Sequence, residues 1–490
     1  MDSMAELTLS LDNHADYQRF LAVRRLPRYR IVGRRCWFPD EYADRLGLPA
    51  EVVRSSEYEP AQFLFDYQRD ISRLAVTKKK YAVFADCGLG KTLILLEFAR
   101  HARKATGKPV LIVSPLMVVP QTMQECSRWY GVELEQVRAK NLSQWLQSGD
   151  SIGITNYDAL GDGMDGSRLG GLILDESSML KSQYGKWGAS CIELGRGVEY
   201  KLCCTGTPAP NDRIEYGNHA VFLEQARTLN EFLATYFVNR GQTDNRWELK
   251  PHALRPFYRA LSHWCIFLSD PSVYGWKDNC ESIPPIKIHI HQVSLTPEQR
   301  QAAQDATGSL MVTNTGGIGS RSSLARLAKG FNGDQEIATN KPDYIRSLIE
   351  SWPNESTIIW CRFNDEQDRM AELFPDAANI SGSTDYEDRL RLIGDFQSGR
   401  RKVLISKPKI LGFGLNLQVA TRQVFSSLQD SYEEFYQAVK RSNRYGSTKP
   451  LNVHIPVTEL EEPMIETVLK KAKRVEEDTK EQERMFRDAE

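Results

Sequence analysis

Apolar and polar positions alternate along this chain in two separate series, each combining short apolar runs with amphipathic stretches. An apolar run of about four to eight residues has the length of a buried strand, and apolar positions that recur every three or four residues indicate a helix. In the first series the pattern predicts a helix at 92–103 and strands at 81–85, 110–113, 171–174 and 200–204. This alternation predicts a parallel sheet covered by helices.

The second series lies beyond residue 286 and repeats the same pattern. It predicts strands at 357–361, 402–406 and 451–456, and helices at 365–373, 386–397 and 432–444. A chain of 490 residues also exceeds what one hydrophobic core supports. The expected fold is therefore α/β, with two parallel-sheet units of similar size.

The remaining segments complete the predicted domain order. Residues 1–56 are expected to form a small basic domain, 57–285 the first α/β unit, 286–468 the second, and 469–490 a charged helix or tail. Within the first unit, the aromatic-rich stretch at about 215–285 is expected to be a helical insertion. A cluster of glycine, serine and threonine at 307–323 predicts a flexible loop.

The N-terminal segment carries seven arginines and no acid between residues 19 and 35, and 29–38 has the pattern of a strand or hairpin. Two interpretations stay open. The arginines are either a patch that contacts nucleic-acid phosphates or a solvated face that keeps a small domain in solution.

Composition narrows the classes of function. The net charge of −1 gives no overall positive field, although a local basic groove is compatible with it. The nine cysteines contain no C-x-x-C pair, so no zinc module is predicted, and dispersed cysteines suit a reducing compartment. No apolar run approaches the roughly 20 residues of a membrane-spanning helix. A cytoplasmic protein without a membrane partner is expected.

The strongest chemical signal is the sequence Ala-Asp-Cys-Gly-Leu-Gly-Lys-Thr at 85–92, between a predicted strand and a predicted helix. Glycines let a backbone fold around phosphate oxygens with its N–H groups pointing inward. Lys91 would neutralise the β- and γ-phosphates, and Thr92 would ligate Mg²⁺. The predicted ATP contacts here are Asp86, Cys87, Gly88, Leu89, Gly90, Lys91 and Thr92.

An acidic pair, Asp175 and Glu176, follows the predicted strand 171–174. Such a pair alone is usually a helix cap, but in a domain with a phosphate loop it predicts a hydrolytic pair. Asp175 would hold the Mg²⁺ ion and Glu176 would polarise the attacking water, so ATP and Mg²⁺ are the expected cofactors.

Several short motifs, in order from 63 to about 456, resemble those of superfamily 2 helicases of the Swi/Snf-like kind. Asp66-Tyr67-Gln68 resembles the glutamine motif, and 85–92 resembles that superfamily's form of the phosphate loop. The other matching strings are Leu111 to Leu116, Ile154 to Tyr157, Thr205 to Pro208, Leu295 to Gln299, Ser381 to Ser383, Gly412 to Leu417 and Gln437 to Gly446.

The resemblance implies two RecA-like lobes that close on ATP. It implies that Gln68 reads adenine and that Arg441 and Arg444 stabilise charge on the γ-phosphate. The alternative for the two arginines is an i, i+3 surface pair on one helix. Coupling between lobes is assigned by the resemblance to Thr205, Gly206, Thr207 and Gln437, and contact with DNA to Ser114, Thr155, Asn156, Lys409 and Asn416.

The family pattern is not complete. The acidic motif ends in Ser178 where relatives have histidine, and the last motif has Asn443 and Ser447 in place of the commoner histidine and glutamine. These departures leave hydrolysis intact and put the efficiency of coupling in doubt. The compact chain suits a bacterial or phage member.

The expected function is an ATP-dependent translocase on double-stranded DNA that remodels DNA or protein–DNA complexes. The alternatives are a strand-separating helicase and an ATP-binding scaffold that recruits a nuclease. Duplex or branched DNA is the expected partner, together with a nuclease or replication and recombination proteins, and RNA is a weaker alternative.

Overall fold

The computed structural model describes residues 4–10, 14–48, 58–181, 186–209, 212–241, 247–277, 283–307, 318–333, 335–411, 415–428, 432–444 and 446–487. The chain divides into two compact units. The first comprises Met1–Asp86, Gly90–Lys277 and Asp478–Glu490, and the second comprises Cys87–Leu89 and Asp278–Glu477.

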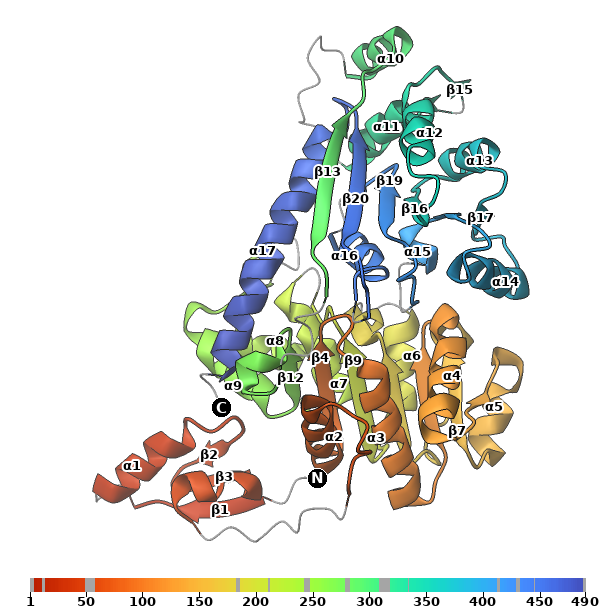
Figure 1. Cartoon of the computed structure of the whole chain (residues 1–490). Helices are drawn as coiled ribbons and strands as arrows, with labels where there is room; N and C mark the ends of the chain where they lie inside the picture. The colour runs from red at the N-terminus through yellow and green to blue at the C-terminus, as the bar shows by residue number, and fades with distance from the viewer. Residues whose placement is uncertain are drawn as a thin grey trace. The chain divides into compact units, whose positions relative to one another are not determined.

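The first unit is built on a seven-stranded sheet in which all paired strands are parallel (Figure 1). Its order is β12-β4-β9-β8-β5-β7-β6, with β4 (Lys80–Ala85), β5 (Val110–Ser114), β6 (Glu135–Gln136), β7 (Ile152–Asn156), β8 (Gly171–Asp175), β9 (Tyr200–Thr205) and β12 (Cys265–Leu268). Its helices include α2 (Asp66–Lys78), α3 (Lys91–Thr106), α4 (Val119–Tyr130), α5 (Ala139–Ser148) and α6 (Lys186–Leu194). Every residue of β5, β8 and β9 is buried, as expected for strands covered on both faces.

The stretch predicted as a helical insertion is only partly helical. It contains α7 (Tyr216–Phe222), α8 (Leu229–Tyr236) and α9 (Leu254–Ser262), but also β10 (Phe237–Asn239), β11 (Trp247–Leu249) and β12. β12 pairs in parallel with β4 and therefore belongs to the central sheet. Its four apolar residues come soon after α9, and a run so short cannot be assigned to helix or strand from periodicity alone.

Residues 4–48, called here the N-terminal module, have a core of their own. β1 (Met4–Thr8), β2 (Arg30–Val32) and β3 (Arg35–Pro39) form an antiparallel sheet in the order β1-β3-β2, next to α1 (His14–Val23). β2 and β3 confirm the predicted hairpin. The core residues are Leu9, Val23, Leu26, Cys36, Phe38, Tyr42, Ala43 and Leu46.

The second unit also has a parallel sheet, which confirms the predicted α/β fold with two such units (Figure 1). Its order is β13-β20-β19-β16-β18-β17, with β13 (Ile286–Gln292), β16 (Thr357–Trp360), β17 (Ala378–Asn379), β18 (Val403–Ser406), β19 (Arg422–Phe425) and β20 (Leu451–Val457). Its helices are α10 (Pro297–Thr307), α11 (Ile318–Ala328), α12 (Lys341–Glu350), α13 (Asn364–Leu373), α14 (Tyr386–Gln397), α15 (Pro408–Leu411), α16 (Tyr432–Lys440) and most of α17 (Glu462–Arg487).

Three predicted boundaries in this half are wrong. Residues 318–323 belong to helix α11, so only 308–317 of the predicted loop lie outside the described residues. Helix α16 ends at Lys440, four residues before the predicted end. The C-terminal helix begins at Glu462, well before 469, because the apolar residues Met464, Ile465 and Val468 are buried and extend it into the core.

Candidate nucleotide-binding site

The phosphate loop connects the end of β4 with the start of α3, as predicted. Gly88 and Gly90 have φ angles of 92° and 69°, in the left-handed region where a side chain is strained. A Cβ atom on Gly90 would also lie 2.2 Å from the Gln68 amide nitrogen. The loop therefore requires glycine at position 90 for two independent reasons.

The close approach of Gly90 brings Gln68 to the loop. Gln68 lies on α2 and is 2% exposed, and its Oε1 atom accepts a hydrogen bond of 3.0 Å from the Phe65 backbone N–H. This bond fixes the start of α2 and the direction of the amide. The structure thus joins Gln68 and the phosphate loop, whereas recognition of adenine stays a prediction.

Lys91 is held inside the loop by two backbone carbonyls. Its ammonium group donates to the carbonyl oxygens of Ala85 at 2.8 Å and Asp86 at 3.1 Å. The Asp86 backbone N–H in turn donates to the Leu268 carbonyl at 2.8 Å, so β12 anchors the start of the loop. Thr92 follows in the first turn of α3.

Asp175 ends β8 and is 6% exposed. The Ser114 hydroxyl donates to its Oδ2 atom at 2.9 Å, and the Tyr157 hydroxyl donates to its backbone carbonyl at 2.7 Å. Burial and the neighbouring Glu176 charge raise the pKa of Asp175 to about 6, although Ser114 and the Lys91 charge act in the opposite direction. The structure therefore brings Lys91 and Asp175 into electrostatic contact.

Glu176 has a φ angle of 51°, which is uncommon for a residue other than glycine. Its Oε2 atom accepts a hydrogen bond of 3.4 Å from the Thr205 hydroxyl, and that hydroxyl accepts one of 3.1 Å from the Thr207 backbone N–H. Both Glu176 and Thr205 are buried. A strained conformation that is held by neighbouring groups is a frequent feature of active sites.

This hydrogen bond links two motifs that the sequence placed 29 residues apart. Thr205, Gly206 and Thr207 were assigned to coupling by resemblance only. Of the three, Thr205 contacts the carboxylate that would polarise water, and the coupling role stays a prediction for all three residues.

Two of the residues predicted to contact DNA are not placed for it. The side chain of Ser114 is fully buried and bonded to Asp175, and that of Thr155 is 1% exposed. Both lie at the ends of strands covered by helices, so their hydroxyl groups face the interior. This corrects the side-chain contact predicted for Ser114 and Thr155. Asn156, half-buried at the end of β7, keeps its assignment as a prediction.

The second unit holds the remaining predicted residues. Gln437 and Arg441 are buried, and the Arg441 guanidinium donates to the Gln437 backbone carbonyl at 3.0 Å and to its side-chain oxygen. Since α16 ends at Lys440, Arg441 and Arg444 lie on the turns after the helix. The alternative of two surface arginines on one helix is therefore wrong. Their participation in the ATP site stays a prediction.

The two DNA candidates of the second unit differ in exposure. Lys409 lies on α15 with its side chain 69% exposed and 4.0 Å from Glu434. Asn416 is half-buried, and its side-chain oxygen accepts a hydrogen bond of 3.2 Å from the Gln418 backbone N–H. Asn416 thus shapes a turn, and contact with DNA stays a prediction for both residues.

Sequence reasoning missed one buried group beside the acidic motif. His219 of α7 is fully buried, and its Nε2 atom lies 3.1 Å from the Ser177 hydroxyl. Burial lowers the pKa of His219 to about 4, so it is neutral at physiological pH. The acidic motif lacks its usual final histidine, and His219 contacts the motif from a distant segment. No spacing in the sequence signals this contact.

The donor atoms fit the predicted magnesium ion. Asp175 and Thr92 offer only oxygen atoms, which is the ligand type that Mg²⁺ prefers. Within the described residues no three histidine, cysteine or acidic side chains are grouped to hold a metal ion by themselves.

The sequence matches two family models over most of its length. Residues 77–341 match the SNF2-related domain, and residues 340–446 match the helicase conserved C-terminal domain. The chain belongs to the SNF2-related family. With both domains present, it is a DNA-dependent ATPase of helicase superfamily 2.

Relatives that match three quarters or more of this SNF2-related chain share a quarter of the aligned residues with it or fewer. "Putative protein p41" of Acyrthosiphon pisum secondary endosymbiont phage 1 is 25% identical over 79% of this chain and 91% of its own length. The SWI/SNF-related matrix-associated actin-dependent regulator of chromatin subfamily A-like protein 1 of Drosophila melanogaster is 21% identical over 84% of this chain. That match spans about half, 56%, of the Drosophila protein.

Among solved structures, the Sulfolobus solfataricus SWI2/SNF2 ATPase core in complex with dsDNA is similar at 20% identity and a TM-score of 0.40. The similarity covers 82% of the SNF2-related chain and 88% of that structure. In the part of the chain that the structure describes, no helix is long and apolar enough to cross a membrane.

Proposed function

We propose that this SNF2-related ATPase uses ATP hydrolysis to move along double-stranded DNA and thereby remodels DNA or protein–DNA complexes. The observation that carries the proposal is the hydrogen bond between Thr205 and Glu176. It connects the predicted hydrolytic carboxylate to the predicted coupling segment, and a motor needs such a connection because hydrolysis must produce movement.

The phosphate loop and the strand ends of the first unit would supply the groups for hydrolysis. The backbone N–H groups of the loop around Gly88 and Gly90 would surround the phosphates, and Lys91 would exchange its two carbonyl partners for phosphate oxygens. Glu176 would orient the attacking water. A bound Mg²⁺ ion, held by Asp175 and Thr92, would neutralise negative charge on the β- and γ-phosphates.

The second unit would complete the reaction with Arg441 and Arg444. Guanidinium groups stabilise the charge that develops on the γ-phosphate in the transition state. The hydrogen bonds from Arg441 to Gln437 orient the guanidinium, so Gln437 would position Arg441. We assign no contact with the phosphate to Gln437 itself.

The experiment compares steady-state ATP hydrolysis without nucleic acid and with duplex DNA, forked DNA, single-stranded DNA and RNA. Duplex or forked DNA should raise the rate well above the basal rate. Displacement of the third strand of a triplex should require ATP and should be lost in Lys91→Ala, which also loses ATP binding.

Three results would contradict the proposal. One is unwinding of a plain tailed duplex as efficient as triplex displacement, which would favour a strand-separating helicase. Another is an ATPase rate that duplex DNA does not raise, together with a bound nuclease whose activity requires ATP binding but not hydrolysis. That result would favour a scaffold. The third is stimulation by RNA in preference to DNA.

A further inference from the structure

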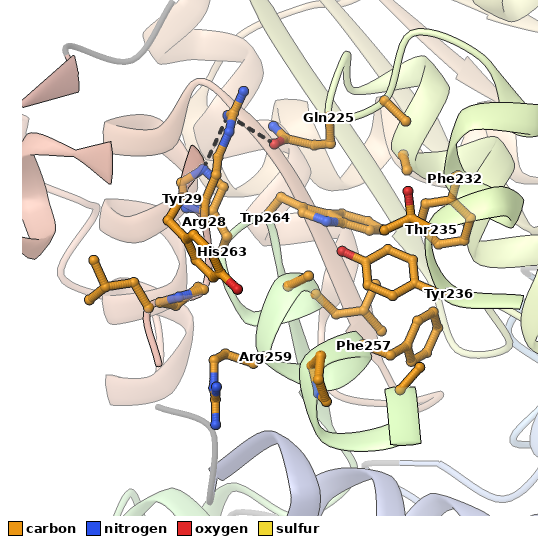
Figure 2. Close-up of a pocket in the computed structure, with 18 of the residues that line it drawn as sticks. Arg28, Tyr29, Gln225, Phe232, Thr235, Tyr236, Phe257, Arg259, His263 and Trp264 are labelled. Atoms are coloured by element: carbon orange, nitrogen blue, oxygen red, sulfur yellow. Dashed lines mark hydrogen bonds between the residues drawn. The ribbon is translucent and has the colours of Figure 1, made fainter. Parts of the chain in front are cut away.

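A cavity of about 690 Å³ lies where the N-terminal module meets α8 and α9 within the first unit (Figure 2). Polar contacts attach the module there. The Tyr42 hydroxyl lies 2.8 Å from His263 Nδ1, and the Arg28 guanidinium lies 3.3 Å from Gln225 Oε1 and 3.4 Å from His263 Nε2. A cavity of this size is in the range of small-ligand sites.

The cavity wall carries a strong excess of positive charge. Arg24, Arg25, Arg28 and Arg259 line it, and Glu231 is the one carboxylate among its lining residues. Glu231 accepts a hydrogen bond of 2.9 Å from the Arg227 backbone N–H, just before α8 begins. Four arginines thus line the cavity together with one carboxylate, which leaves an excess of positive charge in its wall.

These arginines lie close enough to repel one another. The Arg259 guanidinium donates to the Arg24 backbone carbonyl at 3.4 Å, which is a bond to backbone and brings no negative charge. Burial lowers the pKa of Arg259, and the charges of Arg25 and Arg255 lower it further. Within the described chain, Arg24 and Arg25 form no ion pair with an acid. Clustered positive charge of this kind favours binding of an anion.

Aromatic side chains line the same cavity. Figure 2 labels Tyr29, Trp264, Tyr236, Phe232 and Phe257 among its lining residues. Tyr29 is 40% exposed, Tyr236 is half-buried, and the other three are buried. The exposed ring of Tyr29 offers a stacking surface beside the arginines, and the buried rings support the wall behind it.

We propose that this cavity binds an unpaired nucleotide, with its phosphate on Arg24, Arg25 and Arg259 and its base stacked on Tyr29. Arginine with an exposed aromatic ring is the combination that binds single strands without reading sequence. A base must leave its duplex to stack on a protein ring, so the occupant is unpaired. The inference rests on the proposed function as a DNA motor, because it supplies the site that would let the motor distinguish a single-stranded tail or branch from plain duplex.

The experiment measures binding by fluorescence anisotropy to a blunt duplex and to the same duplex with a single-stranded tail. The full-length wild-type protein should bind the tailed duplex more tightly. Tyr29→Ala should reduce this preference by about tenfold, as expected for the loss of one stacked base. The pair Arg24→Ala with Arg25→Ala should also reduce it, through the loss of phosphate contacts. The arginine pair should also lower the salt dependence of tail binding, by roughly 0.7 in the log–log slope for each lost contact.

The matched control is the pair Arg34→Ala with Arg35→Ala. It removes the same charge from the same module, and neither residue lines the cavity. This control should keep the preference for the tail. A photoreactive 5-iodouracil base placed in the tail should crosslink to Tyr29, and this crosslink should be absent in Tyr29→Ala.

The outcomes separate this inference from the proposed function. ATPase stimulation by blunt duplex should be unchanged in the cavity variants. If blunt duplex does not stimulate the wild-type ATPase at all, only the proposed function is contradicted. Equal loss of tail binding in both arginine pairs, or no loss in Tyr29→Ala, would overturn the cavity as a nucleotide site. Competition by dTMP against the tail would identify a free nucleotide as its occupant, whereas competition only by oligonucleotides would identify a DNA strand.

Discussion

A buried carboxylate in the second unit gives a quantitative test of how that unit is held together. Glu461 is 4% exposed and accepts hydrogen bonds of 2.8 and 2.7 Å from the Lys341 ammonium group. It also pairs with Lys329, and the Thr458 backbone N–H and hydroxyl donate to it at 3.2 and 3.0 Å. Glu461→Gln would leave two buried lysines without their counter-charge.

The size of the effect follows from the pKa of Glu461. Burial raises this pKa, but Lys329 and Lys341 lower it more, so that it falls from 4.5 to about 2. At about 1.4 kcal/mol per pKa unit, this net shift corresponds to on the order of 3 kcal/mol in favour of the ionised form of Glu461, after the cost of burying it. Removal of one partner from a buried ion pair typically costs about 3–5 kcal/mol, which agrees.

The assay is urea unfolding monitored by hydrogen exchange of the strands of the second unit. Glu461→Gln should lower the free energy of unfolding by on the order of 3 kcal/mol at pH 7. Because the pKa is depressed in the folded state, the contribution of Glu461 is present above pH 4.5 and is lost as the pH falls toward 2. The difference between variant and wild type should shrink in that same window.

Glu462→Gln is the matched control, since it makes the same change at the next residue, which is exposed. It should change the free energy of unfolding by no more than about 0.5 kcal/mol. If Glu461→Gln costs no more than Glu462→Gln, or if its effect does not depend on pH below 4.5, the ion-pair argument is wrong.

Three further predictions concern the ATP site. Glu176→Gln should keep ATP binding, measured with a fluorescent analogue, and should reduce the rate of phosphate release by about 100-fold or more. Phosphate release at the wild-type rate would exclude Glu176 as the group that activates water. Arg444→Ala should keep near-normal ATP affinity and reduce DNA-stimulated turnover roughly 10³-fold, and Arg444→Lys should also fail because an ammonium lacks the planar two-pronged contact. Normal turnover in Arg444→Ala would refute a site completed by the second unit. Ser114→Ala should slow hydrolysis about tenfold or more through its lost bond to Asp175 while DNA affinity is unchanged; a loss of DNA affinity at normal hydrolysis would restore the original assignment of Ser114.

The sequence by itself determined the features that depend on local chain chemistry. The phosphate loop was predictable because Gly88 and Gly90 must adopt left-handed backbone angles between a strand and a helix, and only glycine does so freely. The main strands were predictable because residues buried on both faces give continuous apolar runs. Asp175 and Glu176 were identified because they follow such a run.

Tertiary structure alone decided how distant segments meet. It placed Thr205 on Glu176, Gln68 against Gly90, and the Ser114 hydroxyl on Asp175, which removed Ser114 from the surface. Each contact joins two residues that are distant in the chain. The residues come together only when the sheet and its helices have assembled.

Tertiary structure also decided that β12 is a strand and where helix α16 ends. The residues Cys265–Leu268 become a strand because the edge of β4 offers hydrogen-bond partners, which no local pattern records. Helix α16 ends at Lys440, and the backbone of the next residue bonds to another segment: the Arg441 carbonyl oxygen accepts a hydrogen bond of 2.9 Å from the Leu417 N–H. Local propensity favours continuing that helix, and long-range hydrogen bonds override it.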